Sequence, residues 1–134
     1  MLSDVSKAFQ DYFGMIIAAN TLAFERADED ALKLVQLRRG LAQKTMNVHR
    51  AVDHFLQVHG IKETQAPLIR EHRAMFSAER GSVSQHQAKW TAPAMKANRD
   101  SYGTDVRALF KMHEDNHRWR MRILIPALES IIAS

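Results

Sequence analysis

Apolar residues recur at intervals of three and four along most of the chain, which predicts helices rather than strands. The first predicted helix covers residues 4–26, with Ser3 as its N-cap, because a serine hydroxyl can accept a hydrogen bond from an unpaired N–H of the first turn. Its apolar face consists of Val5, Phe9, Tyr12, Phe13, Ile16 and Ala23.

Two further helices follow from caps and stops in the sequence. The second covers residues 28–59, with Asp28 as N-cap, acidic residues in its first turn and Gly60 as its stop. The third covers residues 64–88, with Thr64 as N-cap and Pro67 in its first turn. Gly81 lies in the middle of this third helix, where a glycine either ends a helix or weakens it.

The fourth predicted helix covers residues 91–125. Thr91 is its N-cap, Pro93 lies where a missing N–H does no harm, and Pro126 is expected to bend or break the helix. Four long helices with short connections predict an all-α, up-down-up-down four-helix bundle. We expect a single domain over residues 1–134, since no linker or low-complexity stretch interrupts the pattern.

Composition narrows the classes of function. The 134 residues include no cysteine, which excludes disulfides, thiolate metal sites, thiol nucleophiles and covalent haem attachment. The formal net charge of +4 is scattered along the chain, and no nucleic-acid-binding motif accompanies it, so we expect no nucleic-acid partner. The apolar runs are too short for a membrane span or a signal peptide, and we expect a cytoplasmic protein with no membrane partner.

The stretch HEDNHRWRMRILIPALE places polar residues on an apolar helix face. At about 100° per residue, His113 and His117 fall near the middle of the apolar face of the fourth helix. Arg120 lies close to them, and Asn116 lies at the edge of that face. Because an unpaired charge or polar group in a core is costly, these side chains must have partners on other helices.

Histidine and aspartate spacing provides a candidate metal site. Residues four apart on a helix present adjacent donors, as do the pairs His113/His117 and His49/Asp53, and His72 lies on the apolar face of the third helix. Imidazoles and carboxylates aimed at one interior point of a bundle are suited to non-haem iron. The alternative is that these residues are hydrogen-bonded core histidines or surface residues. The predicted metal ligands are His49, Asp53, His72, His113 and His117.

Three segments, VHRAVDHFL, EHRAM and RILIPALE, resemble the hemerythrin-like family, also called HHE cation-binding domains. The resemblance implies a four-helix bundle whose histidines and carboxylates hold a di-iron centre for oxygen binding or redox sensing. Counting back from Pro126, the family's His-x3-Glu positions fall on Asn116 and Arg120, and Tyr12 follows Asp11 where the resemblance implies a histidine.

Two interpretations of this register stay open. In one, the histidines form a shifted iron site with Tyr12 or Glu79 as an oxygen ligand. In the other, the metal has been lost, and Arg120, Asn116 and His72 form a hydrogen-bonded polar cluster; a guanidinium repels a dication and cannot ligate it. Tyr12, Asn116 and Arg120 are therefore the candidate contacts to a bound cofactor or ligand.

The leading hypothesis is a non-enzymatic bundle that binds iron or a small molecule in its core, for oxygen or redox sensing or carriage. No nucleophile–base arrangement, phosphate loop or carboxylate pair points to catalysis. The alternative is a metal-free regulatory or protein-interaction bundle. Phosphotransfer through an exposed His54, and non-covalent haem ligation by His72 and His113, are further hypotheses. Trp119 falls opposite the apolar face and is a candidate contact for a homodimer or a protein partner.

Overall fold

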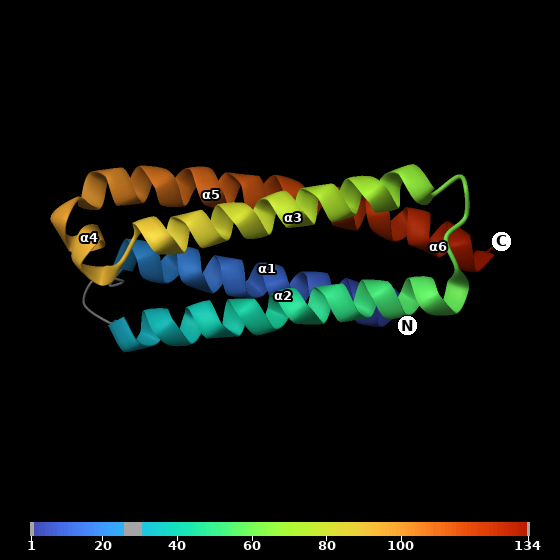
Figure 1. Ribbon diagram of the computed structural model, residues 1–134, viewed down its shortest axis with the longest axis horizontal. Helices are drawn as coiled ribbons and strands as arrows, with labels where there is room; N and C mark the ends of the chain where they lie inside the picture. The colour runs from blue at the N-terminus through green and yellow to red at the C-terminus, as the bar shows by residue number, and fades with distance from the viewer. Residues whose placement is uncertain (1, 26–30, 134) are drawn as a thin grey trace.

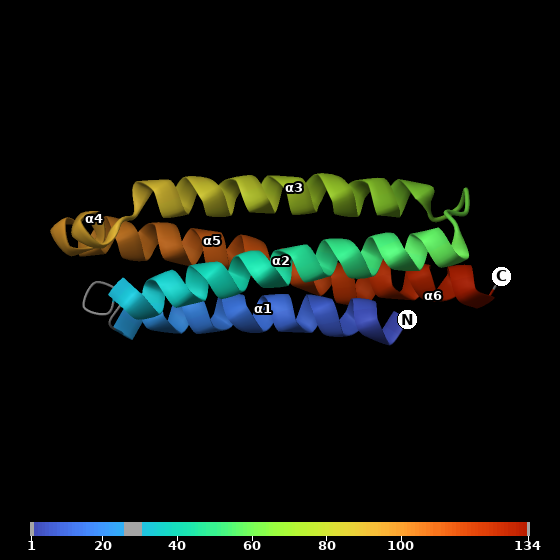
Figure 2. The same ribbon diagram turned by 60° about the horizontal axis from the view of Figure 1, so that its bottom comes forward.

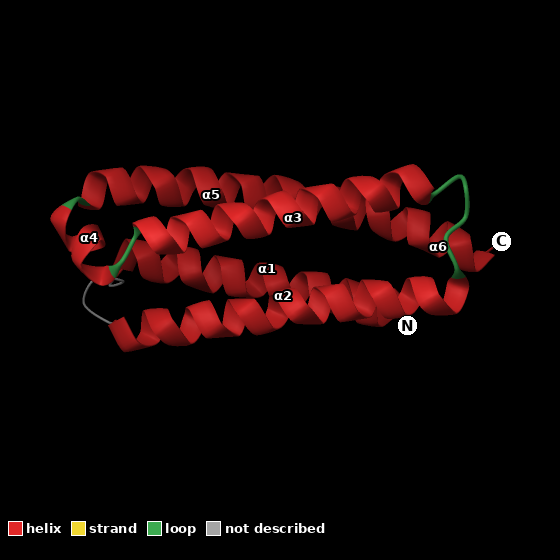
Figure 3. Cartoon of the chain, viewed as in Figure 1, coloured by secondary structure: helices red, strands yellow, loops and turns green. Residues whose placement is uncertain are grey.

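The computed structural model describes residues 2–25 and 31–133, in which every regular element is helical (Figure 3). The prediction of an all-α chain is confirmed for these residues. The elements are α1 (Leu2–Glu25), α2 (Ala31–His59), α3 (Ala66–Lys89), the short α4 (Ala92–Ala97), α5 (Arg99–Trp119), the π-helical turn η1 (Arg120–Leu124) and α6 (Ile125–Ala133).

The long helices lie lengthwise in a helical bundle (Figure 1). Successive long helices run in opposite directions, and α5, η1 and α6 together form the last long run. α1 packs along α2, and α5 packs against both α1 and α3. The turned view in Figure 2 shows α3 on the opposite side of the bundle from α1.

The buried apolar residues form two separate clusters. The larger cluster fills the part of the bundle that contains α6, and Val5, Phe9, Phe55 and Leu128 are among its members. The smaller cluster lies toward α4 and consists of Leu22, Trp90, Met95, Tyr102 and Val106. The hydrophobic core is therefore interrupted part of the way along the bundle.

Several helix ends follow the expected chemistry. Gly60, with φ of 77°, lies directly after α2, and the Thr91 side chain accepts a hydrogen bond from the Ala94 N–H at 3.4 Å. Both predictions are confirmed. The prediction for Thr64 is wrong, because the cap position is Gln65 and the Thr64 hydroxyl donates to the Gln65 side chain at 2.7 Å.

The start of the first helix also differs from the prediction, because Ser3 lies inside α1 rather than at a cap position. The predicted cap Asp28 and the predicted end at Arg26 lie outside the described residues.

The predicted fourth helix is divided near its beginning. Asn98 leaves helical geometry, with φ of −147° and ψ of 72°, and its side chain accepts from the Ser101 N–H at 3.4 Å, so it caps α5. A single helix over residues 91–125 is therefore wrong. The physical reason is that an asparagine amide competes with the helical backbone for hydrogen bonds and favours a cap.

Pro126 does not end the helix. The π-helical turn η1 precedes it, the Ile125 N–H donates to the Arg120 carbonyl, and α6 continues to Ala133. A π-helical turn widens the backbone by one residue. It lies directly before the proline, whose missing N–H would otherwise interrupt an α-helical ladder. The same turn begins at Arg120, a buried residue.

Gly81 lies inside the uninterrupted α3, and a Cβ atom added there would meet nothing within 4 Å. Gly81→Ala is expected to raise the free energy of unfolding by about 0.5–1 kcal/mol, because alanine loses less backbone entropy on folding. Urea denaturation would measure the change. Gly60→Ala is the matched control, and its positive φ predicts a loss of about 1 kcal/mol. A loss at Gly81 as well would contradict the helix described here.

Candidate functional site

The most unusual interior residue is Glu79 on α3, whose side chain is 0% exposed. It shares the buried face of α3 with Ile69, His72 and Phe76, at steps of three and four residues. An ionised carboxylate in such a place is very costly unless donors surround it. The site is therefore defined by what Glu79 binds.

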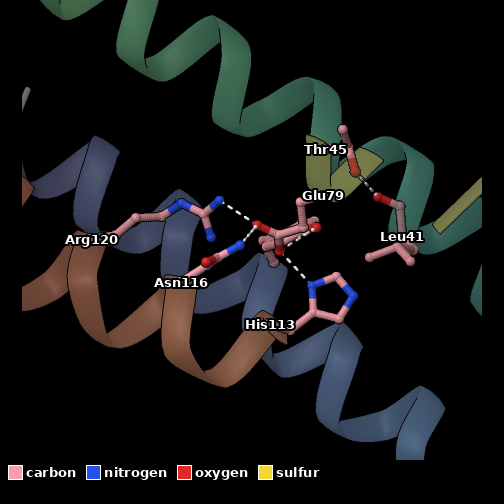
Figure 4. Close-up of polar contacts among 7 residues, drawn as sticks. Leu41, Thr45, Glu79, His113, Asn116 and Arg120 are labelled. Atoms are coloured by element: carbon pink, nitrogen blue, oxygen red, sulfur yellow. Dashed lines mark hydrogen bonds and ion pairs between the residues drawn. The ribbon is translucent and has the colours of Figure 1, made fainter. Parts of the chain in front are cut away.

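Four side chains donate hydrogen bonds to the Glu79 carboxylate (Figure 4). Oε2 accepts from the Tyr12 hydroxyl at 2.9 Å and from Nδ1 of His113. Oε1 accepts from the Asn116 amide at 3.0 Å and from the Arg120 guanidinium at 2.5 Å. A carboxylate has about four lone-pair positions, so these four donors use the whole acceptor capacity of Glu79. We call these five residues the Glu79 cluster.

Helical spacing places three of the donors together. His113, Asn116 and Arg120 are three and four residues apart, which puts them on one helix face, and Figure 4 shows all three directed at Glu79. The aromatic rings of Phe9, Tyr12 and Phe76 surround the guanidinium, with centroids 5.8, 5.9 and 5.2 Å from its central carbon. Such contacts favour a cation at this position.

The electrostatics of the cluster keep Glu79 ionised. Burial by itself would raise the pKa of Glu79, but the hydrogen bond from His113 and the charge of Arg120 outweigh it and lower the pKa to about 2. Burial, together with the Glu79 charge, raises the pKa of Tyr12, so its hydroxyl keeps the proton that it donates. Because Glu79 is an acceptor only, Nδ1 of His113 carries the proton of that hydrogen bond.

Three of the five predicted metal ligands lie in or near the interior. His113 belongs to the Glu79 cluster, and buried His72 lies between Phe9 and Phe76, with ring centroids 5.5 and 5.7 Å apart. Burial lowers the pKa of His72 to about 4, so it is neutral at pH 7. His117 is half-buried and stacks on Phe13 at 4.3 Å.

The other two predicted ligands lie at the surface. His49 is exposed, and its Nε2 lies 2.8 Å from a guanidinium nitrogen of Arg80. Asp53 is exposed and lies 4.0 Å from the Arg73 guanidinium. Within residues 2–25 and 31–133, no three histidine or acidic side chains are grouped so that they could hold a metal ion.

The residues at the expected metal position do not suit a di-iron centre. Asn116 and Arg120 occupy the positions that the resemblance assigns to metal ligands, and both donate to Glu79. A guanidinium has no lone pair for a metal, and its charge repels a dication. His72 is not among the residues that bind Glu79 in the described structure.

Glu79 is more central than the sequence indicated. The sequence placed it on the apolar face of the third helix, as one candidate partner for the buried polar residues and as a candidate oxygen ligand, whereas the structure makes it the acceptor for Tyr12, Asn116 and Arg120. The available signal was an acidic residue on the apolar face of the third helix, because a carboxylate is almost never fully buried unless it is paired.

A cavity of about 70 Å³ lies where the core is interrupted. α1, α2, α3 and α5 all contribute to its walls, which are mostly apolar, and His113 forms part of one wall. The second ring nitrogen of His113, Nε2, is buried and has no hydrogen-bond partner in the described residues.

The remaining predictions concern the surface. His54 is exposed, as predicted. Trp119 is half-buried and packs against the larger core cluster, so its placement opposite the apolar face was wrong. The reason is that α5 contributes side chains from more than one face to the bundle. None of the helices in the described ranges has the length and apolar character needed to span a membrane.

Comparisons of the chain with protein-family models, with curated proteins and with solved structures find no match. The case for a family and for a function therefore depends on the residues themselves.

Proposed function

We propose that this chain is a hemerythrin-like bundle in which a protein ion pair replaces the metal centre, and that it binds a small molecule in its interior without catalysing a reaction. The observation that carries the proposal is the joint binding of Asn116 and Arg120 to Glu79. These are the two positions to which the resemblance assigns metal ligands. Their convergence on one buried carboxylate is expected if a hemerythrin-like centre lost its metal and kept its interior polar.

The cavity supports a binding function. It adjoins the Glu79 cluster through His113, and all the long helices contribute to its walls. A molecule bound in the cavity would contact both core clusters. Its binding would therefore stabilise the arrangement of the helices in which the cavity is formed. This is the property that a sensor or regulatory module requires.

The state of Glu79 supports a non-enzymatic role. A general base must offer a lone pair to the proton it removes. The lone pairs of Glu79 already accept four hydrogen bonds, and its side chain is 0% exposed.

One observation favours iron binding as a second candidate. Nδ1 of His72, Nε2 of His113 and Nδ1 of His117 are buried and have no hydrogen-bond partner in the described part of the chain. Unprotonated imidazole nitrogens are common ligands of iron. A rearrangement that brought these three nitrogens together would be needed for this function.

Metal analysis distinguishes the two candidates. We expect protein from iron-supplemented cultures to contain far less than one iron per chain and to show no oxo-bridge absorption band. The variant Asn116→His/Arg120→Glu puts ligand residues at both positions, and we expect it to gain thermal stability when Fe²⁺ or Zn²⁺ is added.

The matched control is Arg122→Glu, an exposed change of the same charge on η1, which should show no response to metal. Near-stoichiometric iron and an oxo-bridge band in the unmodified protein would reject the proposal and support iron binding.

A further inference from the structure

The cavity adjoins a groove, with which it shares part of its wall. A groove of about 260 Å³ lies between α2 and α3, and it shares four lining residues with the cavity of about 70 Å³. These shared residues are Arg38, Leu41, Val83 and Gln87. Because Arg38 lines both the mostly apolar cavity and the groove, a molecule in the cavity has apolar side chains and the Arg38 side chain within its walls.

The walls of this combined site carry positive charge without negative charge. Arg38 lines both parts and Arg80 lines the groove, whereas the described lining of the two parts includes no aspartate or glutamate. Glu79 lies close by, but its charge is balanced by Arg120 at 2.5 Å. The site therefore favours an anion over a cation of the same shape.

Arg38 is the residue best placed to hold that anion. It is half-buried, and one of its terminal nitrogens donates to the Trp90 carbonyl at 2.7 Å, which fixes the side chain. Within the described residues, no carboxylate lies within ion-pair distance of it. Burial lowers the pKa of Arg38, and the opposing effect of Tyr102 is smaller, as expected for a partly desolvated cation without a carboxylate partner among the described residues.

We propose that the cavity and groove bind a small monocarboxylate, with its apolar body between the two core clusters and its carboxylate on the Arg38 guanidinium. The inference rests on the proposed function, since it names the class of molecule that the interior takes. A planar guanidinium matches the two oxygens of a carboxylate. The dominance of apolar walls in the cavity favours a ligand with a short hydrocarbon body over inorganic phosphate.

Three probes with the same four-carbon chain test this assignment. Butyrate, 1-butanol and butylamine are titrated into the isotope-labelled full chain, and amide chemical shifts report binding. We expect butyrate to bind about tenfold or more tightly than 1-butanol, because a charge-assisted hydrogen bond adds to the same apolar contact. Butylamine should bind most weakly of the three. Inorganic phosphate at equal concentration should not displace butyrate.

Matched variants locate the site. Arg38→Gln should remove the preference for butyrate over 1-butanol, whereas Arg39→Gln, the same change at an exposed neighbour, should leave it intact. Ala19→Leu places a larger side chain in the cavity and should weaken butyrate and 1-butanol alike, whereas Ala18→Leu at an exposed position should not. If Arg38→Gln loses its helical circular dichroism, Arg38→Lys takes its place. We expect Arg38→Lys to prefer butyrate over 1-butanol less strongly than the unmodified chain does, and this comparison, with the probe series on the unmodified chain, tests the role of Arg38.

Each failure has a separate meaning. Equal binding of butyrate and 1-butanol, an unchanged preference in Arg38→Gln, or displacement by phosphate would overturn the carboxylate assignment and leave interior binding in place. Binding of none of the probes would overturn both the assignment and the proposed binding function.

Discussion

Replacing Arg120 with methionine is expected to lower the free energy of unfolding by about 3–5 kcal/mol. The reason is the charge that remains. Glu79 is 0% exposed and has a guanidinium 2.5 Å from Oε1, so the substitution leaves an unpaired carboxylate in the core. Urea denaturation at pH 7, followed by circular dichroism, would measure the loss.

A double-mutant cycle separates this charge effect from lost packing. Glu79→Leu combined with Arg120→Met removes both charges, and the double variant should be clearly more stable than the sum of the single losses predicts. Arg122→Met is the control for loss of an exposed arginine from the same turn and should change stability by less than about 0.5 kcal/mol. Strictly additive losses would show that Glu79 and Arg120 do not act as a pair.

Acidification is expected to destabilise the fold in two stages. The first stage comes mainly from His72, whose pKa of about 4 lies below its ordinary value of 6.5 because of burial; burial also lowers the pKa of His86 and of His117, which add to the same stage. Between these two values the unfolded chain binds a proton that the folded chain does not bind. Stability is therefore lost as the pH falls from 6.5 toward 4, by up to about 3 kcal/mol at 1.36 kcal/mol per pKa unit.

The second stage comes from Glu79, whose folded pKa of about 2 is below its ordinary value of 4.5. Its contribution is fully present above 4.5 and is lost as the pH falls toward 2. Unfolding free energies measured by urea denaturation between about pH 7 and pH 4 report mainly the first stage.

His72→Leu isolates the His72 contribution. A leucine has no proton to bind, so this variant should lose much less stability than the unmodified chain between about pH 6.5 and pH 4.5. His54→Leu removes an imidazole from the surface and is the matched control. An unchanged pH profile in His72→Leu would mean that another group carries the first stage.

The helices were predictable because their signal is local. Three- and four-residue spacing defined the long helices, and Gly60 and Thr91 marked ends that the structure has. Asn98 was missed because a break depends on a close balance between backbone and side-chain hydrogen bonds. The π-helical turn was missed because no simple residue pattern specifies it, and it carries the helix through Pro126.

The sequence predicted which residues of the last long run are buried, but not which side chain they bind. Periodicity placed His113 and Arg120 in the interior and required them to have partners, which is confirmed by their contacts with Glu79. The identity of that partner depends on how α3 is rotated and shifted against α5. The spacing of residues within each helix does not determine this relative placement of the two helices. For the same reason, spacing alone could not show that His49 and Asp53 lie at the surface.

The Glu79 cluster joins α1, α3 and the last long run, and none of its members comes from α2. α2 packs mainly on α1, and its polar side-chain contacts toward α3 are the exposed ones at His49 and Asp53 and the hydrogen bond from Arg38 to the Trp90 carbonyl, directly after α3. Buried hydrogen bonds therefore tie α1, α3 and the last long run to one another, whereas α2 is held to them mainly by buried apolar side chains such as Val48 and Phe55.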